Sequence, residues 1–309
     1  MKMMKTKWMV ILLLAITANN YFGQQKPMFT MYSFNPMSYN PGYAGSQNAI
    51  NATLVSRFQW VKFDGSPMSQ SLTVHSPLKN KKLGVGMTIL NDKIGSSNNL
   101  VINADFSYTI KLNSNNDKLA FGLKGGIGSY RNNFSSLLVH DATDEVYNAP
   151  ISGKINPNFG FGLYYHGKRH YVGLALPQLI PNQLTNSGSQ IASYETSHLF
   201  LTAGYVFEMN SIWDFKPSLL IKGAINSPLA MELTTSFLYN EKIWFGAMYR
   251  HQESVGLHFI VNIIDNLKFG YAYDFGITDI QKYAQGSHEL MLSFNMKKGS
   301  SQFLSPRFF

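Results

Sequence analysis

Short segments in which apolar and polar residues alternate run through the whole chain. From Leu100 to Leu112, the even-numbered residues are apolar, whereas most odd-numbered residues are polar and include Asp105. A period of two puts the two sets on opposite faces of an extended strand. A helix would instead give a period near 3.6. The same split recurs at 83–89, 199–208 and 267–275. The pattern therefore predicts β-strands that each have one apolar and one polar face.

Fourteen such segments follow one another, and the connections between them tend to alternate in length. Short connections such as 77–81 and 113–117 are rich in Asn, Asp, Gly and Lys, as tight turns are, whereas 131–156 and 177–196 are long. We therefore predict an all-β fold, a transmembrane antiparallel β-barrel of about 14 strands in a bacterial outer membrane, with the short turns facing the periplasm. The expected strands are 50–60, 68–76, 82–90, 99–112, 118–130, 157–166, 168–176, 197–208, 213–223, 229–239, 241–250, 253–262, 266–275 and 287–296.

A soluble β-sandwich also alternates, but two features argue against it. Several polar faces carry small residues and charges of both signs, as the wet or plugged lumen of a barrel would. The chain also begins like a secretory signal, with a lysine-rich start, the apolar run Trp8–Ile16 and then small residues. We predict a signal peptide over 1–23 with cleavage before Gln24, and Ala18 is the other candidate for the cleavage site.

The apolar run of the signal is too short for a transmembrane helix, and no later run reaches the required length. Strands are then the only possible spanning elements. No Pro/Ser tract or charge block divides the rest of the chain, so we expect one barrel domain over 50–296. An Asn-Pro-rich segment over 24–49 is expected at the periplasmic mouth or in the lumen, and a periplasmic C-terminal tail is expected over 297–309.

Charge and composition exclude some classes of function. The 26 basic residues exceed the 17 acidic ones, but they are scattered along the chain, which argues against a nucleic-acid surface. The absence of cysteine excludes disulfides and thiolate metal ligands. Charges predicted to face the lumen have both signs, so they could pair and brace a plug, tune ion passage or simply be solvated. They are Asp105, Lys111, Lys124, Glu208, Glu232, Lys268 and Asp274.

Aromatic residues make up 14% of the chain, and many lie near the ends of the predicted strands. Aromatic girdles at the two membrane interfaces would produce this pattern, and so would the ordinary preference of aromatic residues for strands. The residues concerned are Trp60, Phe207, Trp213, Tyr239, Trp244, Tyr249, Tyr273 and Phe275.

The segment 29–46, before the first strand, is unusual for a simple porin. It holds two Asn-Pro pairs and two glycines that enforce turns, together with Tyr and Phe side chains. This segment resembles the N-terminal signature of the PorP/SprF family, which comprises outer-membrane proteins of the type IX secretion system and of gliding motility in Bacteroidota. Further stretches resemble the same family: Arg57–Trp60 with Phe63–Pro67, Tyr171–Pro177, Gly286–Leu290 and Ser305–Phe309.

The resemblance spans nearly the whole chain after the signal. It implies a non-enzymatic outer-membrane barrel that supports type IX secretion or the surface attachment of exported adhesins, by docking cargo or machinery components. The implied partners are type IX components, an exported surface protein with a C-terminal sorting domain and outer-membrane lipid. The alternative is a passive pore for small solutes, although a plain porin has no evident use for the Asn-Pro-rich segment.

The sequence offers no pattern typical of catalysis or metal binding. None of the eight histidines has metal-ligand spacing, and no serine lies in a Gly-x-Ser-x-Gly turn. Ser287 and His288 are adjacent, so on a strand they point to opposite faces and make a poor catalytic pair. We therefore expect no enzyme activity, no catalytic, cofactor-binding or metal-binding residues, and no nucleic-acid partner.

Two groups of residues are candidates for binding a partner. The N-terminal segment supplies a possible plug or partner site: Tyr32, Phe34, Asn35, Pro36, Asn40, Pro41, Gly42, Tyr43 and Gly45. The loop 177–196 supplies a possible docking site, because its first residues are apolar although the loop is expected outside the cell. These residues are Pro177, Leu179, Ile180 and Pro181. The same loop could equally fold inward over the pore.

Overall fold

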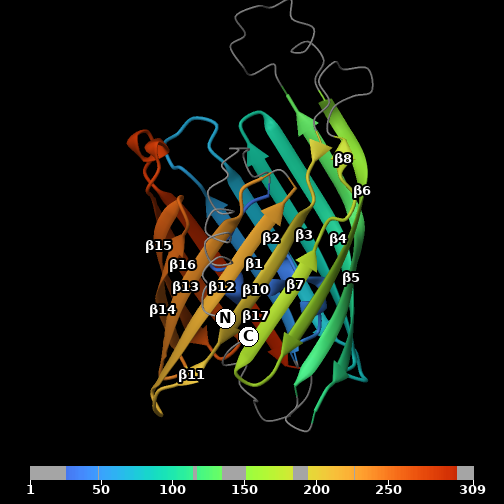
Figure 1. The fold of residues 1–309 in the computed structure, drawn as a ribbon, viewed down its shortest axis with the longest axis vertical. Helices are drawn as coiled ribbons and strands as arrows, with labels where there is room; N and C mark the ends of the chain where they lie inside the picture. Colours follow the sequence, from blue (N-terminus) through green and yellow to red (C-terminus); the bar gives the residue numbers. More distant parts are fainter. Residues whose placement is uncertain are drawn as a thin grey trace, which may run out of the picture.

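The computed structural model describes residues 26–47, 49–113, 117–133, 151–183, 194–225 and 227–297. Its long strands are β1 (Ala49–Phe58), β2 (Met68–Pro77), β3 (Leu83–Ile94), β4 (Ser97–Lys111), β5 (Lys118–Asn132), β6 (Ile151–His166), β7 (His170–Leu176), β10 (His198–Tyr205), β12 (Trp213–Ala224), β13 (Ala230–Tyr239), β14 (Ile243–Arg250), β15 (Ser254–Ile264), β16 (Leu267–Gly276) and β17 (Ser287–Lys297). Consecutive strands pair antiparallel, and β1 pairs with β17, so the sheet closes into a barrel (Figure 1). The predicted 14-stranded antiparallel barrel is confirmed.

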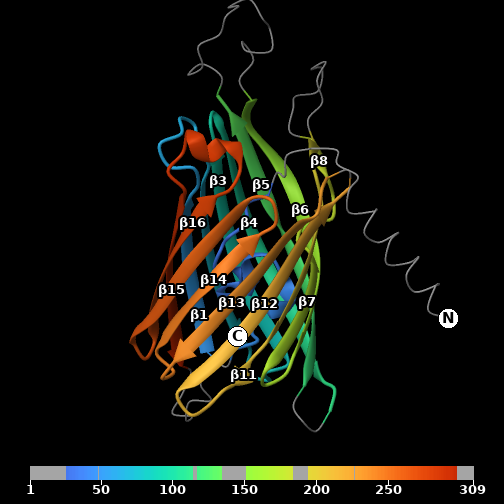
Figure 2. The same cartoon turned by 60° about the vertical axis from the view of Figure 1, so that its left-hand side comes forward.

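Three shorter strands accompany this ring. β11 (Phe207–Glu208) continues β10 along β12, and β8 (Asn182–Gln183) pairs with β9 (Tyr194–Glu195) in the connection between β7 and β10. This small hairpin lies at the same rim as the short helix η5 (Asp279–Lys282), as Figure 2 shows. Connections at the opposite rim, such as 78–82 between β2 and β3 and 167–169 between β6 and β7, are all short. Because outer-membrane barrels place their longer loops outside the cell, we assign the rim of β8 and η5 to the outer face.

Side chains of the wall alternate between the lumen and the outer surface. In β4, Asn103 and Asp105 are buried toward the lumen, whereas Ile102 and Phe106 on the other face are 40% and 43% exposed. The same alternation along the other strands gives the barrel an apolar outer surface. Lipid can cover such a surface, because every backbone polar group of a closed sheet is bonded to a neighbouring strand.

Two strand boundaries differ clearly from the sequence prediction. β3 and β4 continue until only Gly95 and Ser96 connect them, where a loop over 91–98 was expected, and the positive φ of Gly95 (56°) suits this tight hairpin. β6 begins at Ile151 rather than at 157. The extra residues of β3 and β4 are mostly polar, because they lie beyond the apolar band and need no lipid-facing side chains. The predicted signal peptide and almost all of the predicted tail 297–309 lie outside the described residues.

Two predictions about side-chain direction are wrong. Lys111 and Glu208, expected in the lumen, are exposed at strand ends, and Glu208 pairs with Arg169 in the turn before β7 (Nε to Oε1, 3.0 Å). At the rim, side chains of either parity reach solvent. Trp244, a candidate for an aromatic girdle, is only 3% exposed and faces the lumen, because its neighbour Phe245 takes the outward position.

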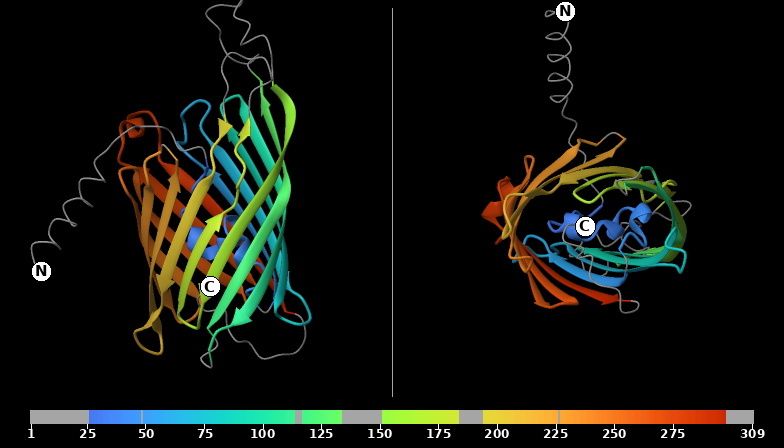
Figure 3. Two further views of the ribbon diagram at one scale, coloured as in Figure 1. Left: turned by 45° about the vertical axis from the view of Figure 1, so that its right-hand side comes forward. Right: turned by 90° about the horizontal axis from the view of Figure 1, so that it is seen from below.

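The N-terminal segment 26–47 runs through the lumen, where the view along the barrel in Figure 3 shows it across the middle. It contains three one-turn 3₁₀ helices, η1 (Tyr32–Phe34), η2 (Pro36–Ser38) and η3 (Pro41–Tyr43). A proline opens η2 and η3 directly after an asparagine, and the Asn40 side chain caps η3 by accepting the N–H of Gly42 at 2.8 Å. Within the described residues, no helix is long and apolar enough to cross a bilayer.

Candidate functional site

A buried ionic cluster holds the N-terminal segment to the wall. Glu289 of β17 accepts hydrogen bonds from the backbone N–H groups of Thr30 and Met31, both at 2.8 Å. The Thr30 hydroxyl donates to Asp274 of β16 at 2.7 Å. Arg57 of β1 bridges the two acids, at 2.6 Å from Asp274 and 3.2 Å from Glu289. We call these five residues the latch.

The latch favours the state in which the segment occupies the lumen. The side chains of Arg57, Asp274 and Glu289 are at most 3% exposed, and withdrawing such charges from water is expensive unless partners satisfy them. The N–H groups of the segment supply part of that satisfaction, so its removal would leave a buried carboxylate under-bonded. A second pair continues the cluster, since Arg250 lies 2.7 Å from Glu232 and 3.8 Å from Asp274.

Glycines let the segment approach the wall backbone to backbone. A Cβ atom at Gly122 of β5 would lie 2.1 Å from the backbone nitrogen of Gly42. A Cβ atom at Gly84 of β3 would lie 2.1 Å from the carbonyl oxygen of Ala44. Any side chain at these two wall positions would displace the segment, so the sequence of the wall is adapted to the segment inside it.

Aromatic side chains fill the remaining space around the segment. Phe34 lies edge-on to Trp244, with ring centroids 5.5 Å apart, and the Lys216 ammonium lies 4.0 Å above the Phe34 ring. A cation over an aromatic face is stabilised by the ring quadrupole. Tyr43 lies edge-on to Tyr164 at 5.2 Å, and burial raises the pKa of Tyr43 to about 12. Tyr43 therefore stays neutral at physiological pH.

The structure places every residue of the predicted plug site inside the lumen. Phe34 and Gly45 are half-buried, and the others are buried: Tyr32, Asn35, Pro36, Asn40, Pro41, Gly42 and Tyr43. Among the predicted lumen charges, Asp274 and Glu232 belong to the ionic cluster, and Lys124 pairs with Asp105 at 2.8 Å. The sequence reasoning missed the latch roles of Thr30, Arg57 and Glu289. The parity of β17 could have pointed to Glu289, because it alternates with the outward residue Leu290.

The predicted docking loop divides between the lumen and the outside. Pro177 and Gln178 turn inward and line a lumen chamber, whereas Leu179 and Ile180 are 47% and 49% exposed and Pro181 is exposed too. The loop is tied to the wall, because the N–H of Leu179 donates to the carbonyl of Phe159 at 2.7 Å. The described start of the loop therefore turns inward at Pro177 and Gln178, and the next three residues are exposed.

Glu195 connects this loop region to the N-terminal segment. Its carboxylate pairs with the Lys26 ammonium and accepts a hydrogen bond from the Gln178 amide at 2.8 Å. Burial alone would raise the pKa of Glu195, but the Lys26 charge and the hydrogen bonds outweigh burial and hold that pKa below its usual value. Glu195 is therefore ionised, and the pair joins the start of the segment to the outer rim.

Comparison with known families shows to which family the chain belongs. The family described as "Type IX secretion system membrane protein PorP/SprF" matches residues 21–294. The chain belongs to the PorP/SprF family. The resemblance read from the sequence is thereby confirmed, and with it a place in the outer membrane and in type IX secretion. No curated protein matches the chain.

Solved structures similar to this PorP/SprF barrel are outer-membrane channels. "CymD monoaromatic hydrocarbon channel" is 11% identical, with a TM-score of 0.53, over 90% of this chain and 95% of that one. The Ralstonia pickettii toluene transporter TbuX is 11% identical, with a TM-score of 0.50, over 89% and 95%. Such low identities show a shared barrel fold and nothing of a shared substrate. Among the described residues, no group of three His, Cys, Asp or Glu side chains could hold a metal ion.

Proposed function

We propose that this barrel is a plugged docking protein, which binds an exported surface protein or a type IX component at its outer rim instead of passing small solutes. The observation that carries the proposal is the pair Leu179 and Ile180. Both apolar side chains are about half exposed on a loop expected outside the cell. Exposed apolar side chains on a loop often mark an interaction site.

The described residues at the start of the loop are held by hydrogen bonds, which favours binding. Ser197 donates to the carbonyl of Leu179 at 3.3 Å, and Gln178 beside it is held by Glu195. A loop that is ordered before binding loses less conformational entropy when a partner arrives. The N-terminal segment supports the same function from inside, because a filled lumen makes the wall a rigid platform for the loop.

The double variant Leu179→Asp with Ile180→Asp tests the proposal. We expect normal amounts of folded barrel but weaker surface display of a cognate type IX cargo, because two carboxylates would have to be buried against the partner. The matched control is Ile277→Asp with Tyr283→Asp, which changes two exposed residues of another outer loop. Wild-type display of every type IX cargo with the first variant would exclude this loop as the docking site.

A passive pore is the second candidate function. It is supported by the neighbours in fold, which are described as a hydrocarbon channel and a toluene transporter. A pore would need the N-terminal segment to leave the lumen or to leave a path beside it. Pull-down of the tagged barrel, followed by mass spectrometry, separates the candidates, since a docking protein retains type IX proteins and a pore retains none.

A further inference from the structure

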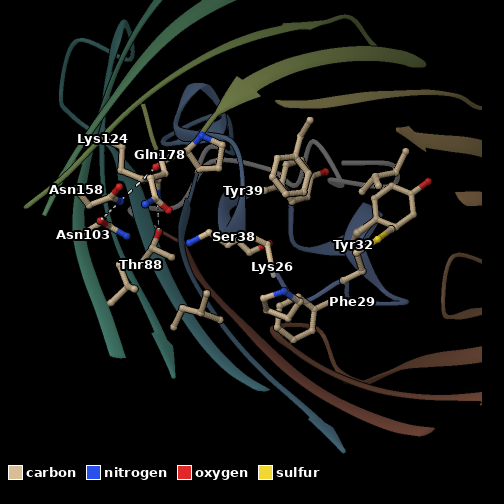
Figure 4. Close-up of a pocket in the computed structure, with 17 residues that line it drawn as sticks. Lys26, Phe29, Tyr32, Ser38, Tyr39, Thr88, Asn103, Lys124, Asn158 and Gln178 are labelled. Atoms are coloured by element: carbon tan, nitrogen blue, oxygen red, sulfur yellow. Dashed lines mark hydrogen bonds between the residues drawn. The ribbon is translucent and has the colours of Figure 1, made fainter. Parts of the chain in front are cut away.

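A chamber lies in the lumen between the N-terminal segment and the beginning of the connection from β7 to β10 (Figure 4). The empty space in and around it is about 750 Å³, and this figure includes open solvent. Its apolar side is formed by Phe29 and Tyr39 of the segment and by Phe200 and Leu220 of the wall. Most small-molecule sites are concave and mainly apolar, with a few polar groups that orient the ligand.

The other end of the chamber is polar, and Asn158 of β6 lies there beside Asn103 (Figure 4). The Asn158 side chain is more than nine-tenths buried, and its Nδ2 donates to Asn103 Oδ1 at 2.7 Å and to the carbonyl of Pro177 at 3.2 Å. These two acceptors fix the orientation of the amide. Its Oδ1 is left without a hydrogen-bond partner among the described residues. A buried acceptor of this kind gains free energy when a ligand donates to it.

The charges around the chamber cancel in pairs. Lys124 at the polar end lies 2.8 Å from Asp105, and Lys26 at the entrance pairs with Glu195. Among the described residues that line the chamber, an ionised ligand would find no free counter-charge, and it would lose its hydration. The chamber chemistry therefore fits a neutral molecule.

We infer that the chamber binds a small neutral amphipathic molecule, with its apolar body against Phe200 and Leu220 and a hydroxyl or amide N–H donated to Asn158 Oδ1. The site lies inside the lumen and is distinct from docking at the outer rim. It goes beyond the proposed function, and neither depends on the other.

The absence of native cysteine makes a protection assay possible. Ser38 lines the chamber, and Ser76 lies at the periplasmic end of β2, and each is half-buried with its hydroxyl bonded to a backbone carbonyl. Ser38→Cys therefore reports on the chamber, and Ser76→Cys is a control thiol on the outward face of β2, away from the chamber. Each purified full-length barrel in lipid nanodiscs is modified with a water-soluble methanethiosulfonate reagent. The probe is 4-butylphenol, which has a donor, and 4-butylanisole serves as the analogue without one.

We expect 4-butylphenol to slow modification of Ser38→Cys with a saturable dose dependence and to leave Ser76→Cys unchanged. Because a single hydrogen bond to the buried amide is lost, 4-butylanisole should need a concentration roughly fivefold higher. Adding Asn158→Leu should abolish this difference between the two probes. In the Ser38→Cys background, Leu220→Trp should remove protection by filling the chamber, whereas Leu219→Trp on the opposite face of β12 should not.

Two results would overturn the inference. The first is an absence of saturable protection of Ser38→Cys up to the solubility limit of 4-butylphenol. The second is equal protection of both thiols, which would mean that the probe acts through the bilayer. Equal potency of the two probes on Ser38→Cys alone would overturn the assignment of Asn158. None of these results uses the Leu220→Trp variant, so misfolding of that variant leaves the test intact.

Discussion

Glu289 holds the N-terminal segment by accepting hydrogen bonds from backbone N–H groups, and not from side chains. The contact does not depend on which side chain stands at position 31, but it depends fully on the carboxylate at 289. The Arg57 charge is compensated by that carboxylate and by Asp274. One acid therefore serves both the segment and the wall.

The variant Glu289→Gln should lower the free energy of unfolding by about 3 kcal/mol, because it breaks a buried ion pair while Arg57 stays in place. Urea unfolding of the barrel in lipid vesicles measures this. Glu208→Gln is the control, because Glu208 pairs with Arg169 at the exposed rim and should cost less than about 1 kcal/mol. Equal losses in the two variants would contradict the role of the latch.

Glu195 should make the position of the first residues of the N-terminal segment, near Lys26, sensitive to acid. Its pKa is lowered in the folded protein, so its pair with Lys26 contributes stability above the ordinary glutamate pKa and loses it as the pH falls through the lowered value. Spin labels at Pro27→Cys and Ser197→Cys should give one narrow distance at neutral pH and a broad distribution in acid. Glu195→Gln should give the broad distribution already at neutral pH. A narrow distribution in that variant would show that the pair does not fix the segment.

The latch could not be predicted from the sequence, although its charges were visible there. Arg57 and Glu289 are 232 residues apart, and only the closure of the barrel between β1 and β17 brings them together. Alternation correctly placed Asp274 inward, but it could not say that Thr30 would contact it. Which residues contact the inward side chains of the wall depends on the path of the N-terminal segment. The sequence of this segment has no periodic pattern from which that path could be predicted.

The secondary-structure elements of the N-terminal segment and of the wall are in close backbone contact. η3 lies against β5 at Gly122, and Ala44, just after η3, lies against β3 at Gly84. Gly122→Ala should displace η3 from the wall and raise the conductance of the barrel in planar bilayers. Gly128→Ala on the same strand is the matched control, because its Cβ would meet nothing closer than 3.6 Å. Equal conductance of the two variants would show that the segment does not rely on this approach.

The strands themselves were largely predictable, because lipid and lumen impose a period of two along each of them. The prediction ended β3 at 90 and began β6 at 157, whereas the strands extend to Ile94 and start at Ile151. Both errors fall toward the outer rim, beyond the apolar band. There the chain continues as a sheet without needing an apolar face, so the pattern on which the prediction rested is missing.

At the scale of the whole molecule, the apolar outer surface anchors the barrel in the membrane. Phe106 on β4 is 43% exposed, with Val85 and Leu123 opposite it on the neighbouring strands, both exposed as well. Phe106→Arg should therefore cost about 2–4 kcal/mol if the residue lies near the bilayer midplane. Tyr283→Arg, in an outer loop, should change the free energy of unfolding by less than about 0.5 kcal/mol. Equal unfolding curves in lipid vesicles would contradict this placement in the membrane.

Conductance measurements can show whether the N-terminal segment closes the barrel. Full-length protein and a variant lacking residues 24–46 are reconstituted in planar bilayers, after resistance to unfolding in cold SDS shows that both barrels are folded. We expect no stable conductance steps for the full-length barrel and clear steps for the shortened one, because the latch and the glycine contacts keep the segment in the lumen. Steps of the same size from both proteins would contradict it and would make this barrel a pore.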